Sequence, residues 1–321
     1  MAAADWQSVL ADAVRSPAEL CQQLGLDPAL AVGAERAAGS FSLLVPQPYL
    51  ARIQPGDPSD PLLLQILPQA AEIVAVPGYG ADPVGEVNAL CGPNLLRKYQ
   101  GRILMVTTGA CGVHCRFCFR RHFPYVPIFS PALRKIAADR SIDEVILSGG
   151  DPLALPDIEL ARLVDELAEI PHLRRLRIHT RLPVVIPQRV TDELISWIRG
   201  SRLSPIMVVH VNHPAEIDQA VAVAFGRLVD AGIPVLNQSV LLRGINDRAD
   251  VLAELCRRLV DLRVMPYYLH QLDAVAGAAH FEVPISTGIA LMVELRARLP
   301  GYAVPRYVRE TPGGRGKEVL A

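Results

Sequence analysis

The sequence predicts an α/β fold, either an α/β barrel or a doubly wound sheet. Apolar, β-branched segments recur from residue 102 onward, helical patterns separate them, and polar residues suited to chemistry follow several of them. After the first interval, the centres of these segments lie about 30 residues apart, which is the length of one strand and helix unit. Six such units imply a parallel, curved sheet. The predicted strands are residues 102–107, 144–148, 176–179, 206–210, 235–240 and 264–269.

Helices are expected between these strands. The clearest pattern covers residues 158–167, where apolar side chains recur at helical spacing and form one stripe. Ser130 followed by Pro131 predicts the start of another helix, because serine caps helices and proline fits their first turn. The predicted stripe consists of Leu160, Leu163, Val164 and Leu167.

Residues 1–101 predict a small helical region joined to the barrel by a rigid, irregular segment. A helical pattern runs through residues 16–24, and prolines gather in residues 45–49 and 55–61. We interpret residues 82–86 as turn chemistry, so nothing in this region indicates catalysis. The expected division is therefore an N-terminal helical and proline-rich region (1–101), a barrel (102–300) and a C-terminal segment (301–321).

Composition limits the class of protein. A chain of 321 residues, 50% of them hydrophobic, suits one barrel-type domain with an appendage. The formal net charge of −1 provides no overall field that would favour nucleic acid or an anionic membrane. The chain starts with polar residues soon after Met1 and has no run long enough to span a bilayer. We therefore expect a cytoplasmic protein with a small-molecule partner.

Three cysteines are the most informative feature. Cys111, Cys115 and Cys118 are spaced C-x3-C-x2-C, and a 4Fe-4S cluster normally takes four cysteines, so this trio would leave one iron open. A zinc site that includes His114 or His122 is an alternative, but zinc sites usually pair two ligand dyads across a longer loop. Inert thiols are a further alternative, and we favour the cluster. The other cysteines, expected as small core residues, are Cys21, Cys91 and Cys256.

The polar residues should share one rim of the barrel, because loops after the carboxyl ends of barrel strands form the active site. The cysteine motif follows the first predicted strand, and residues 148–152 follow the second. His210, Gln238 and residues 269–273 lie at or beyond the fourth, fifth and sixth strands.

The cysteine motif resembles that of radical S-adenosylmethionine enzymes, in which the methionine part of the nucleotide chelates the open iron. Residues 116–125, 237–243 and 265–270 further resemble the lysine 2,3-aminomutase family. This similarity covers roughly residues 40–317 and implies a partial (β/α)6 radical S-adenosylmethionine barrel. The segment that resembles the family's glycine-rich stretch beside the methionine is Ser148, Gly149, Gly150 and Asp151.

The resemblance also implies pyridoxal phosphate (PLP) as a cofactor. Lys317 follows the glycine-rich residues 312–316 and matches the family's Schiff-base lysine, although a lysine in a terminal tail is ordinarily a solvated charge. Glycines let the backbone approach a phosphate closely. Arg102 matches a phosphate-binding arginine, with an exposed charge at a strand end as the alternative. Residues 301–321 are therefore expected to be a C-terminal PLP-binding segment.

Substrate and nucleotide residues follow from the same resemblance. Arg120 matches the arginine that binds the lysine carboxylate, and Asp273 matches a carboxylate that receives the terminal ammonium. Glu310 occupies the position of a second such carboxylate, where free-lysine aminomutases have aspartate. For both acidic residues the alternative is a solvated surface position. His210 and Gln238 match residues that line the nucleotide site, with an interior hydrogen bond as the alternative for each.

Departures from the family pattern suggest one branch. Glu310 and residues 267–270 and 277–281 resemble the aminomutase that makes (R)-β-lysine for elongation factor P modification. The sequence ends four residues after Lys317, without the zinc-binding extension that free-lysine enzymes use in assembly, which favours the same branch. Residues 312–316, in contrast, look more like the loop of the free-lysine enzymes.

The implied function is therefore an isomerase that converts L-lysine to (R)-β-lysine by a 5′-deoxyadenosyl-radical 1,2-amino migration. The cluster on the three cysteines would reduce S-adenosylmethionine, and PLP would delocalise the spin on the substrate. The expected partners are an electron donor such as flavodoxin or ferredoxin, and elongation factor P with its lysyl ligase. One alternative is a free-lysine 2,3-aminomutase of catabolism or osmolyte synthesis. Another is a non-catalytic iron-sulfur electron carrier or sensor, which would leave Lys317 and the shared rim unexplained.

Overall fold

The computed structural model of the chain describes residues 5–125 and 130–321. Within these ranges one ten-stranded sheet runs in the order β1 to β10, so that each strand pairs with its neighbours in sequence. Strands β3 to β9 are parallel, and antiparallel pairs flank them at both edges. The parallel strands are β3 (Arg102–Thr108), β4 (Glu144–Gly149), β5 (Arg175–Thr180), β6 (Ser204–His210), β7 (Val235–Val240), β8 (Met265–His270) and β9 (Arg306–Arg309).

The six predicted strands are confirmed as β3 to β8, each within two residues of its expected bounds. Their continuous apolar runs arise because a parallel sheet is covered on both faces. All of β4 is buried, for example. The parallel strand β9 is an addition that the sequence analysis does not predict, and β10 (Glu318–Val319) pairs with it in antiparallel fashion.

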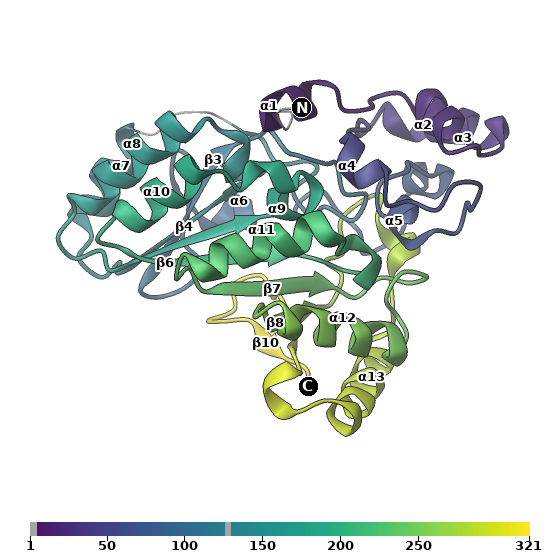
Figure 1. Cartoon of the computed structure of the whole chain (residues 1–321). Coiled ribbons are helices and arrows are strands. Elements are labelled where there is room, and N and C mark those ends of the chain that lie inside the picture. Colours follow the sequence, from purple (N-terminus) through teal and green to yellow (C-terminus); the bar gives the residue numbers. More distant parts are fainter. Residues whose placement is uncertain (1–4, 126–129) are drawn as a thin grey trace.

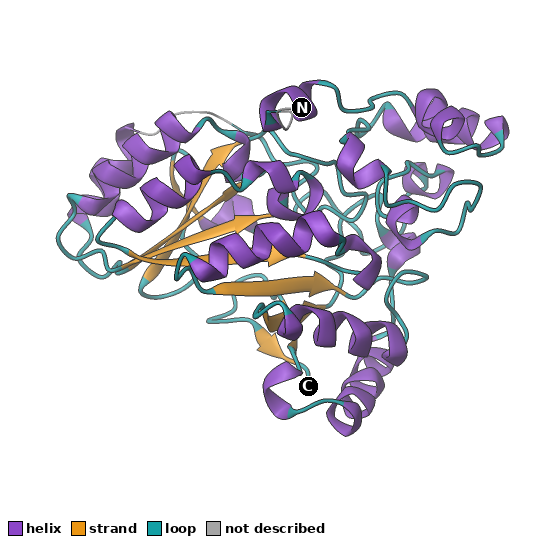
Figure 2. Ribbon diagram, viewed as in Figure 1, coloured by secondary structure: helices purple, strands orange, loops and turns teal. Residues whose placement is uncertain are grey.

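Helices between the parallel strands cover the outside of the curved sheet (Figures 1 and 2). The predicted helix at 158–167 is α8, and its buried residues are the four of the expected stripe. The helix predicted at Ser130 is α7, although the capping side chain of Ser130 lies outside what the structure describes. These helices are α7 (Ser130–Ala138), α8 (Asp157–Ala168), α9 (Leu182–Val185), α10 (Asp192–Gly200), α11 (Gln219–Asp230), α12 (Ala249–Asp261) and α13 (Ile285–Arg298). Short 3-10 helices accompany them at η2 (Pro152–Ala154), η3 (Pro187–Arg189), η4 (Pro214–Glu216), η5 (Ala279–Phe281) and η6 (Gly301–Ala303).

The N-terminal region is largely helical, as expected, and its helices within residues 17–64 lie beyond the carboxyl ends of the central strands (Figure 1). Prolines start several of these helices because proline fits the first turn. Its helices are α1 (Trp6–Ala11), α2 (Pro17–Gln23), α3 (Pro28–Ala38), α4 (Gln47–Leu50), α5 (Pro61–Leu64), η1 (Ala70–Ile73) and α6 (Glu86–Ala89). This region also supplies β1 (Leu90–Gly92) and β2 (Leu95–Leu96), and β2 pairs with β3. The sheet therefore extends on both sides of residues 102–300.

The core follows the sheet and its helices. Cys21 and Cys256 are buried in it as expected, whereas Cys91 is only half-buried at its edge. In the described ranges, no helix combines the length and the apolar character needed to cross a membrane.

Candidate active site at the carboxyl ends of the strands

One cavity of about 480 Å³ opens at the carboxyl ends of the parallel strands. All of the site residues that the sequence analysis singles out line it, although they come from segments spread over most of the chain. This placement follows from the parallel sheet, whose strands end on the same side. These residues are Arg102, Cys111, Cys115, Cys118, Arg120, Ser148, Gly149, Gly150, Asp151, His210, Gln238, Asp273, Glu310 and Lys317.

The three motif cysteines lie in the loop that follows β3. The N-terminal region holds this loop in place, because His114 donates its backbone N–H to the Leu44 carbonyl at 3.1 Å and Arg116 donates to the Gln65 carbonyl at 2.8 Å. Arg116 also forms a fully buried ion pair with Glu72 at 2.6 Å. Backbone hydrogen bonds and a buried ion pair with the N-terminal region therefore anchor the loop that carries the thiols, without any contribution from a metal.

The glycines after β4 let this loop come close. Gly150 donates its N–H to the Thr108 carbonyl at 2.7 Å, and a Cβ on Gly150 would lie 2.2 Å from the Ala110 carbonyl oxygen. Gly149 has a φ of +130°, a conformation that residues with side chains rarely adopt. Glycine at both positions is thus needed to seat the cysteine loop against the end of β4.

The donor set fits an iron-sulfur cluster better than a zinc ion. His114 turns its Nδ1 to Ser42, and His122 lies near the Ala276 carbonyl, so neither imidazole joins the thiols. Among the described residues, no group of three or more His, Cys, Asp or Glu side chains surrounds a single metal position. A four-iron cluster spreads its thiolates over several iron atoms, so they need not meet at one point.

Asp151 connects the ends of two strands. Its Oδ1 accepts hydrogen bonds from the Leu153 N–H and the Thr180 hydroxyl, and its Oδ2 accepts from the N–H groups of Arg181 and Leu182. Burial raises the pKa of Asp151, while these donors lower it. The side chain therefore fixes the loops that line the cavity, and its neighbours Gly149 and Gly150 present backbone there.

Arg120 is buried and already holds a carboxylate. Its Nε and Nη2 donate to Glu86 at 2.8 and 2.6 Å, and its Nη1 donates to the Ser148 hydroxyl at 2.9 Å. The interpretation of residues 82–86 as turn chemistry alone is wrong for Glu86, which is 4% exposed. Asp82 does act as a turn residue, since it accepts the Glu86 and Val87 N–H groups at the start of α6.

Glu310 and Lys317 flank the turn between β9 and β10, where Arg309 pairs with Glu318. This pairing places Glu310 opposite Lys317, whose Nζ donates to the carboxylate at 2.5 Å. Burial alone would raise the pKa of Glu310, but Lys317, Tyr99 and Lys98 hold it below its usual range. The N-terminal region therefore contributes Glu86, Lys98 and Tyr99 to the cavity, although nothing in its sequence indicates a site.

A group of cavity residues fits PLP. The Lys317 amine is only partly exposed and lies 5.9 Å from the centre of the Tyr268 ring. Arg102 lies over the Tyr99 ring at 4.6 Å, so its guanidinium is held at the cavity wall and is not free at a strand end. The amine suits the aldehyde of PLP, the arginine suits its phosphate, and the flat aromatic surface suits its ring.

Asp273 has a carboxyl group with few partners that would stabilise its negative charge. Its side chain makes no hydrogen bond within the described part of the chain, and burial raises its pKa to about 7, although Lys317 opposes the shift. Such a group gains most from a cation that enters the cavity, because the cation would restore its charged form.

His210 and Gln238 stand on β6 and β7 at the cavity wall. His210 has an interior hydrogen bond from its Nε2 to the Asn212 Oδ1 at 3.0 Å, and burial lowers its pKa to about 4. Burial also holds the pKa of His179 and of His270 well below the usual value. These imidazoles are therefore neutral at pH 7, and they can act there as hydrogen-bond partners without adding charge.

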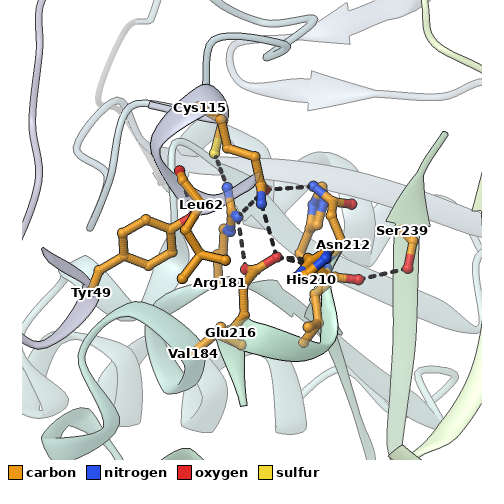
Figure 3. A network of polar contacts seen from close by, with 12 residues as sticks. Tyr49, Leu62, Cys115, Arg181, Val184, His210, Asn212, Glu216 and Ser239 are labelled. Carbon is orange, nitrogen blue, oxygen red and sulfur yellow. Dashed lines mark hydrogen bonds and ion pairs between the residues drawn. The ribbon is translucent and has the colours of Figure 1, made fainter. Parts of the chain in front are cut away.

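A buried arginine beside the thiols is the residue that sequence reasoning misses most clearly. Arg181 follows β5 directly, and its Nη1 lies 2.7 Å from the Cys115 Sγ (Figure 3). The signal that could have found it is its position, since it stands at the carboxyl end of a predicted strand like the other site residues. Its partners Gln65 and Glu216 carry no comparable signal in the sequence.

Comparison with models of known protein families finds no match. The L-lysine 2,3-aminomutases of Haemophilus influenzae and Escherichia coli are each 45% identical to the chain, over 99% and 98% of its length and 96% and 94% of theirs. That of Clostridium subterminale is 37% identical over 98% of the chain and 77% of its own length. Among solved structures, Streptococcus suis SuiB bound to S-adenosylmethionine has a TM-score of 0.50 at 11% identity, covering 70% of the chain and 53% of SuiB. The likeness to SuiB concerns the fold alone.

Proposed function

The chain belongs to the lysine 2,3-aminomutase family of radical S-adenosylmethionine isomerases, and we propose that it makes (R)-β-lysine for the modification of elongation factor P. The observation that carries this proposal is the shared cavity. The cysteine loop after β3 and Lys317 before β10 line the same space, with Arg120 and Asp273 also on its wall. The residues that would generate the radical, hold PLP and bind an amino acid therefore line one space.

Cys111, Cys115 and Cys118 would hold the 4Fe-4S cluster, and the backbone at Gly149 and Gly150 would lie beside the methionine part of S-adenosylmethionine. When bound and reduced, this pair supplies a carbon-centred radical that can remove a hydrogen atom from a substrate carbon. His210 and Gln238 would contact the nucleotide. Because burial keeps His210 neutral, it would do so as a hydrogen-bond partner.

Lys317 would hold PLP through its amine, and Arg102 would bind the phosphate. When bound, PLP supplies a conjugated ring over which an unpaired electron of the substrate can spread. Lys317 first has to leave its ion pair with Glu310. Lys98 and Tyr99 stay as partners of the Glu310 carboxylate, so the release of Lys317 does not leave a buried charge unpaired.

Arg120, Asp273 and Glu310 would orient the substrate lysine. The Arg120 guanidinium is fixed by Glu86 and Ser148, and a fixed fork suits the two oxygens of a carboxylate. Asp273 would take the terminal ammonium. Binding this cation lowers the pKa of Asp273 from about 7, so the carboxyl group loses its proton as the substrate enters. The protein's contribution is therefore placement of the reacting carbons and protection of the radical.

The central claim is tested by anaerobic incubation of the reconstituted protein with L-lysine, PLP, S-adenosylmethionine and a reductant. Chiral analysis of the products should reveal (R)-β-lysine. Protein that carries a full cluster and cleaves S-adenosylmethionine yet yields no β-lysine would contradict the proposed substrate.

The elongation factor P assignment needs a separate experiment, because turnover of free lysine does not separate it from a catabolic or osmolyte role. Glu310 and residues 267–270 and 277–281 support it through their resemblance to that branch, whereas residues 312–316 favour the free-lysine enzymes. Deletion of the gene should remove β-lysine from elongation factor P in the cytoplasm, where the lysyl ligase and a flavodoxin or ferredoxin donor would act. Fully β-lysylated factor in the deletion strain would support the free-lysine alternative.

A further inference from the structure

Arg181 is placed where it can act on the metal centre without being a ligand. It stands between β5 and α9, where its own N–H and that of Leu182 both donate to the Oδ2 of Asp151, the residue after the double glycine. The side chain then runs inward and ends 2.7 Å from the Cys115 Sγ (Figure 3). Asp151 also donates its backbone N–H to the Ala110 carbonyl at 2.7 Å, so this one residue contacts both the cysteine loop and the segment that carries Arg181.

The orientation of the guanidinium is determined from the side opposite the thiol. Its Nη2 donates to the Gln65 Oε1 at 2.6 Å and to the Glu216 Oε2 at 2.8 Å. Glu216 is itself fixed, because its Oε1 accepts the backbone N–H groups of Asn212 and His213. This leaves Nη1 directed at Cys115, and Figure 3 shows Cys115 and Glu216 on different sides of the guanidinium.

The positive charge of Arg181 is buried, and the carboxylate of Glu216 does not lie between this charge and the Cys115 sulfur. The side chain is 7% exposed and the Glu216 side chain is fully buried. The rings of Tyr49 and Phe117 lie 5.7 and 5.6 Å from the guanidinium carbon, which keeps water from this side of it. Cys115 thus faces the positive end of the pair, while the negative end lies on the other side of the guanidinium.

We infer that Arg181 raises the reduction potential of the cluster, by donating a charge-assisted hydrogen bond to the Cys115 sulfur and by placing a buried positive charge beside it. The inference rests on the proposed role of Cys115 as a cluster ligand. Reduction adds one electron, supplied by an external low-potential donor, and so adds one negative charge to the cluster. A nearby positive charge and hydrogen bonds to the sulfurs stabilise that reduced form.

Arg181 and Glu216 carry opposite charges, so their removal should shift the reduction potential of the cluster in opposite directions. Arg181→Gln removes the positive charge, and Glu216→Gln removes the negative charge that partly offsets it while keeping an oxygen for the Asn212 N–H. If both residues only maintained the fold, the two changes would shift the potential in the same direction or not at all. The inference requires opposite shifts.

The experiment is a reductive titration of the reconstituted full-length protein, followed by the electron paramagnetic resonance signal of the reduced cluster and normalised to iron content. At a fixed applied potential, Arg181→Gln should lower the ratio of reduced to oxidised cluster about tenfold, which is about 59 mV for a one-electron couple. Arg181→Lys keeps the charge and should restore part of this loss, and Glu216→Gln should raise the ratio. Arg177→Gln is the matched control, because Arg177 lines the same cavity but pairs with Glu144, and it should leave the ratio within twofold.

An unchanged reduction potential in Arg181→Gln would overturn the inference. A reduction potential that falls in Glu216→Gln, as it should in Arg181→Gln, would overturn it too. Weaker binding of S-adenosylmethionine to Arg181→Gln at an unchanged potential would overturn it too, and would make Arg181 a nucleotide contact. If Arg181→Gln takes up no iron, Arg181→Lys and Glu216→Gln decide the result. A wild-type protein whose cluster titrates normally but which forms no β-lysine would contradict the proposed function while leaving this comparison intact.

Discussion

Glu86 and Arg120 form a buried two-point ion pair, although they stand in segments that the sequence analysis assigns to different regions. The side chains of Arg120 and Glu86 are only 8% and 5% exposed. The pair joins the N-terminal region to the cysteine loop, because Arg120 follows Cys118 by two residues. It also sets the direction in which the Arg120 guanidinium faces the cavity.

Removal of Glu86 should therefore be costly. Glu86→Ala leaves a buried guanidinium with Ser148 alone, and loss of one partner of a buried pair costs about 3 kcal/mol of stability. Denaturant unfolding of the apoprotein measures this cost, and the KM for lysine should rise as Arg120 loses its orientation. Glu166→Ala, which breaks the exposed pair with Arg162, should change stability by at most about 0.5 kcal/mol. Equal effects of the two variants would contradict the role of burial.

The two proposed cofactor sites should be separable by single substitutions. Lys317→Ala should abolish β-lysine formation and covalent attachment of PLP, yet leave the cluster absorbance unchanged, because Lys317 lies on the β9–β10 hairpin whereas the thiols lie in the loop after β3. Cys115→Ala should remove both β-lysine formation and the cluster absorbance. Lys135→Ala, at an exposed position on α7, is the control and should behave like wild type. Loss of the cluster in Lys317→Ala would show that the two sites are not independent.

Asp273 should make the apoprotein less stable as pH rises. Its pKa is about 7 in the folded protein and near the model-peptide value of about 3.9 in the unfolded chain, so the folded state binds the extra proton between these values. The stabilising effect of this proton is complete below about pH 4 and is lost as pH approaches 7. Asp273→Asn removes it. The stability of Asp273→Asn relative to wild type should therefore increase by about 2–3 kcal/mol between pH 5 and pH 8.

Thermal unfolding of both proteins across this pH range measures that difference. A stability difference that does not change with pH would mean that Asp273 is already ionised in the empty cavity. In that case, the affinity for lysine should also be independent of Asp273 protonation. The expected pattern is tighter binding of lysine to wild type as pH rises from 6 to 8, with no such gain in Asp273→Asn.

Gly150→Ala should displace the cysteine loop. The new Cβ would overlap the Ala110 carbonyl oxygen, which is backbone and cannot rotate away as a side chain could. We expect a loss of at least about 2 kcal/mol of stability and reduced iron uptake on reconstitution. Gly226→Ala, in the middle of α11 with open space around it, is the matched control and should stabilise the protein by about 0.5–1 kcal/mol. Full iron uptake by Gly150→Ala would argue against close seating of the loop.

The main features of the fold follow from the sequence because the central strands are buried on both faces and therefore apolar along their length, as in β4. The sequence does not predict β9, which has only four residues and an arginine at each end. Its place in the sheet depends on pairing with β8 and on the C-terminal hairpin, which are not local properties. The antiparallel strands β1 and β2 are missed for the same reason.

A site residue can be predicted from the sequence when its side chain is chemically distinctive and it lies in a recognisable motif or at the end of a predicted strand. The cysteines, the glycines after β4 and the residues at strand ends carry such a signal, and Lys317 is found through resemblance. Glu86 is missed because aspartate, proline and glycine before it are typical of a turn, and the sequence does not indicate that the next carboxylate is buried. Glu216 and Gln65 are likewise identified only when the fold places them beside Arg181.

The β9–β10 hairpin that carries Glu310 and Lys317 joins the parallel strands through the pairing of β9 with β8. A form of the protein in which this hairpin is detached from β8 would keep the cysteine loop but would lack the groups proposed to hold PLP and the substrate ammonium. With the roles proposed above, such a form would hold the cluster without a substrate beside it. Docking of the hairpin onto β8 would therefore couple the two halves of the site.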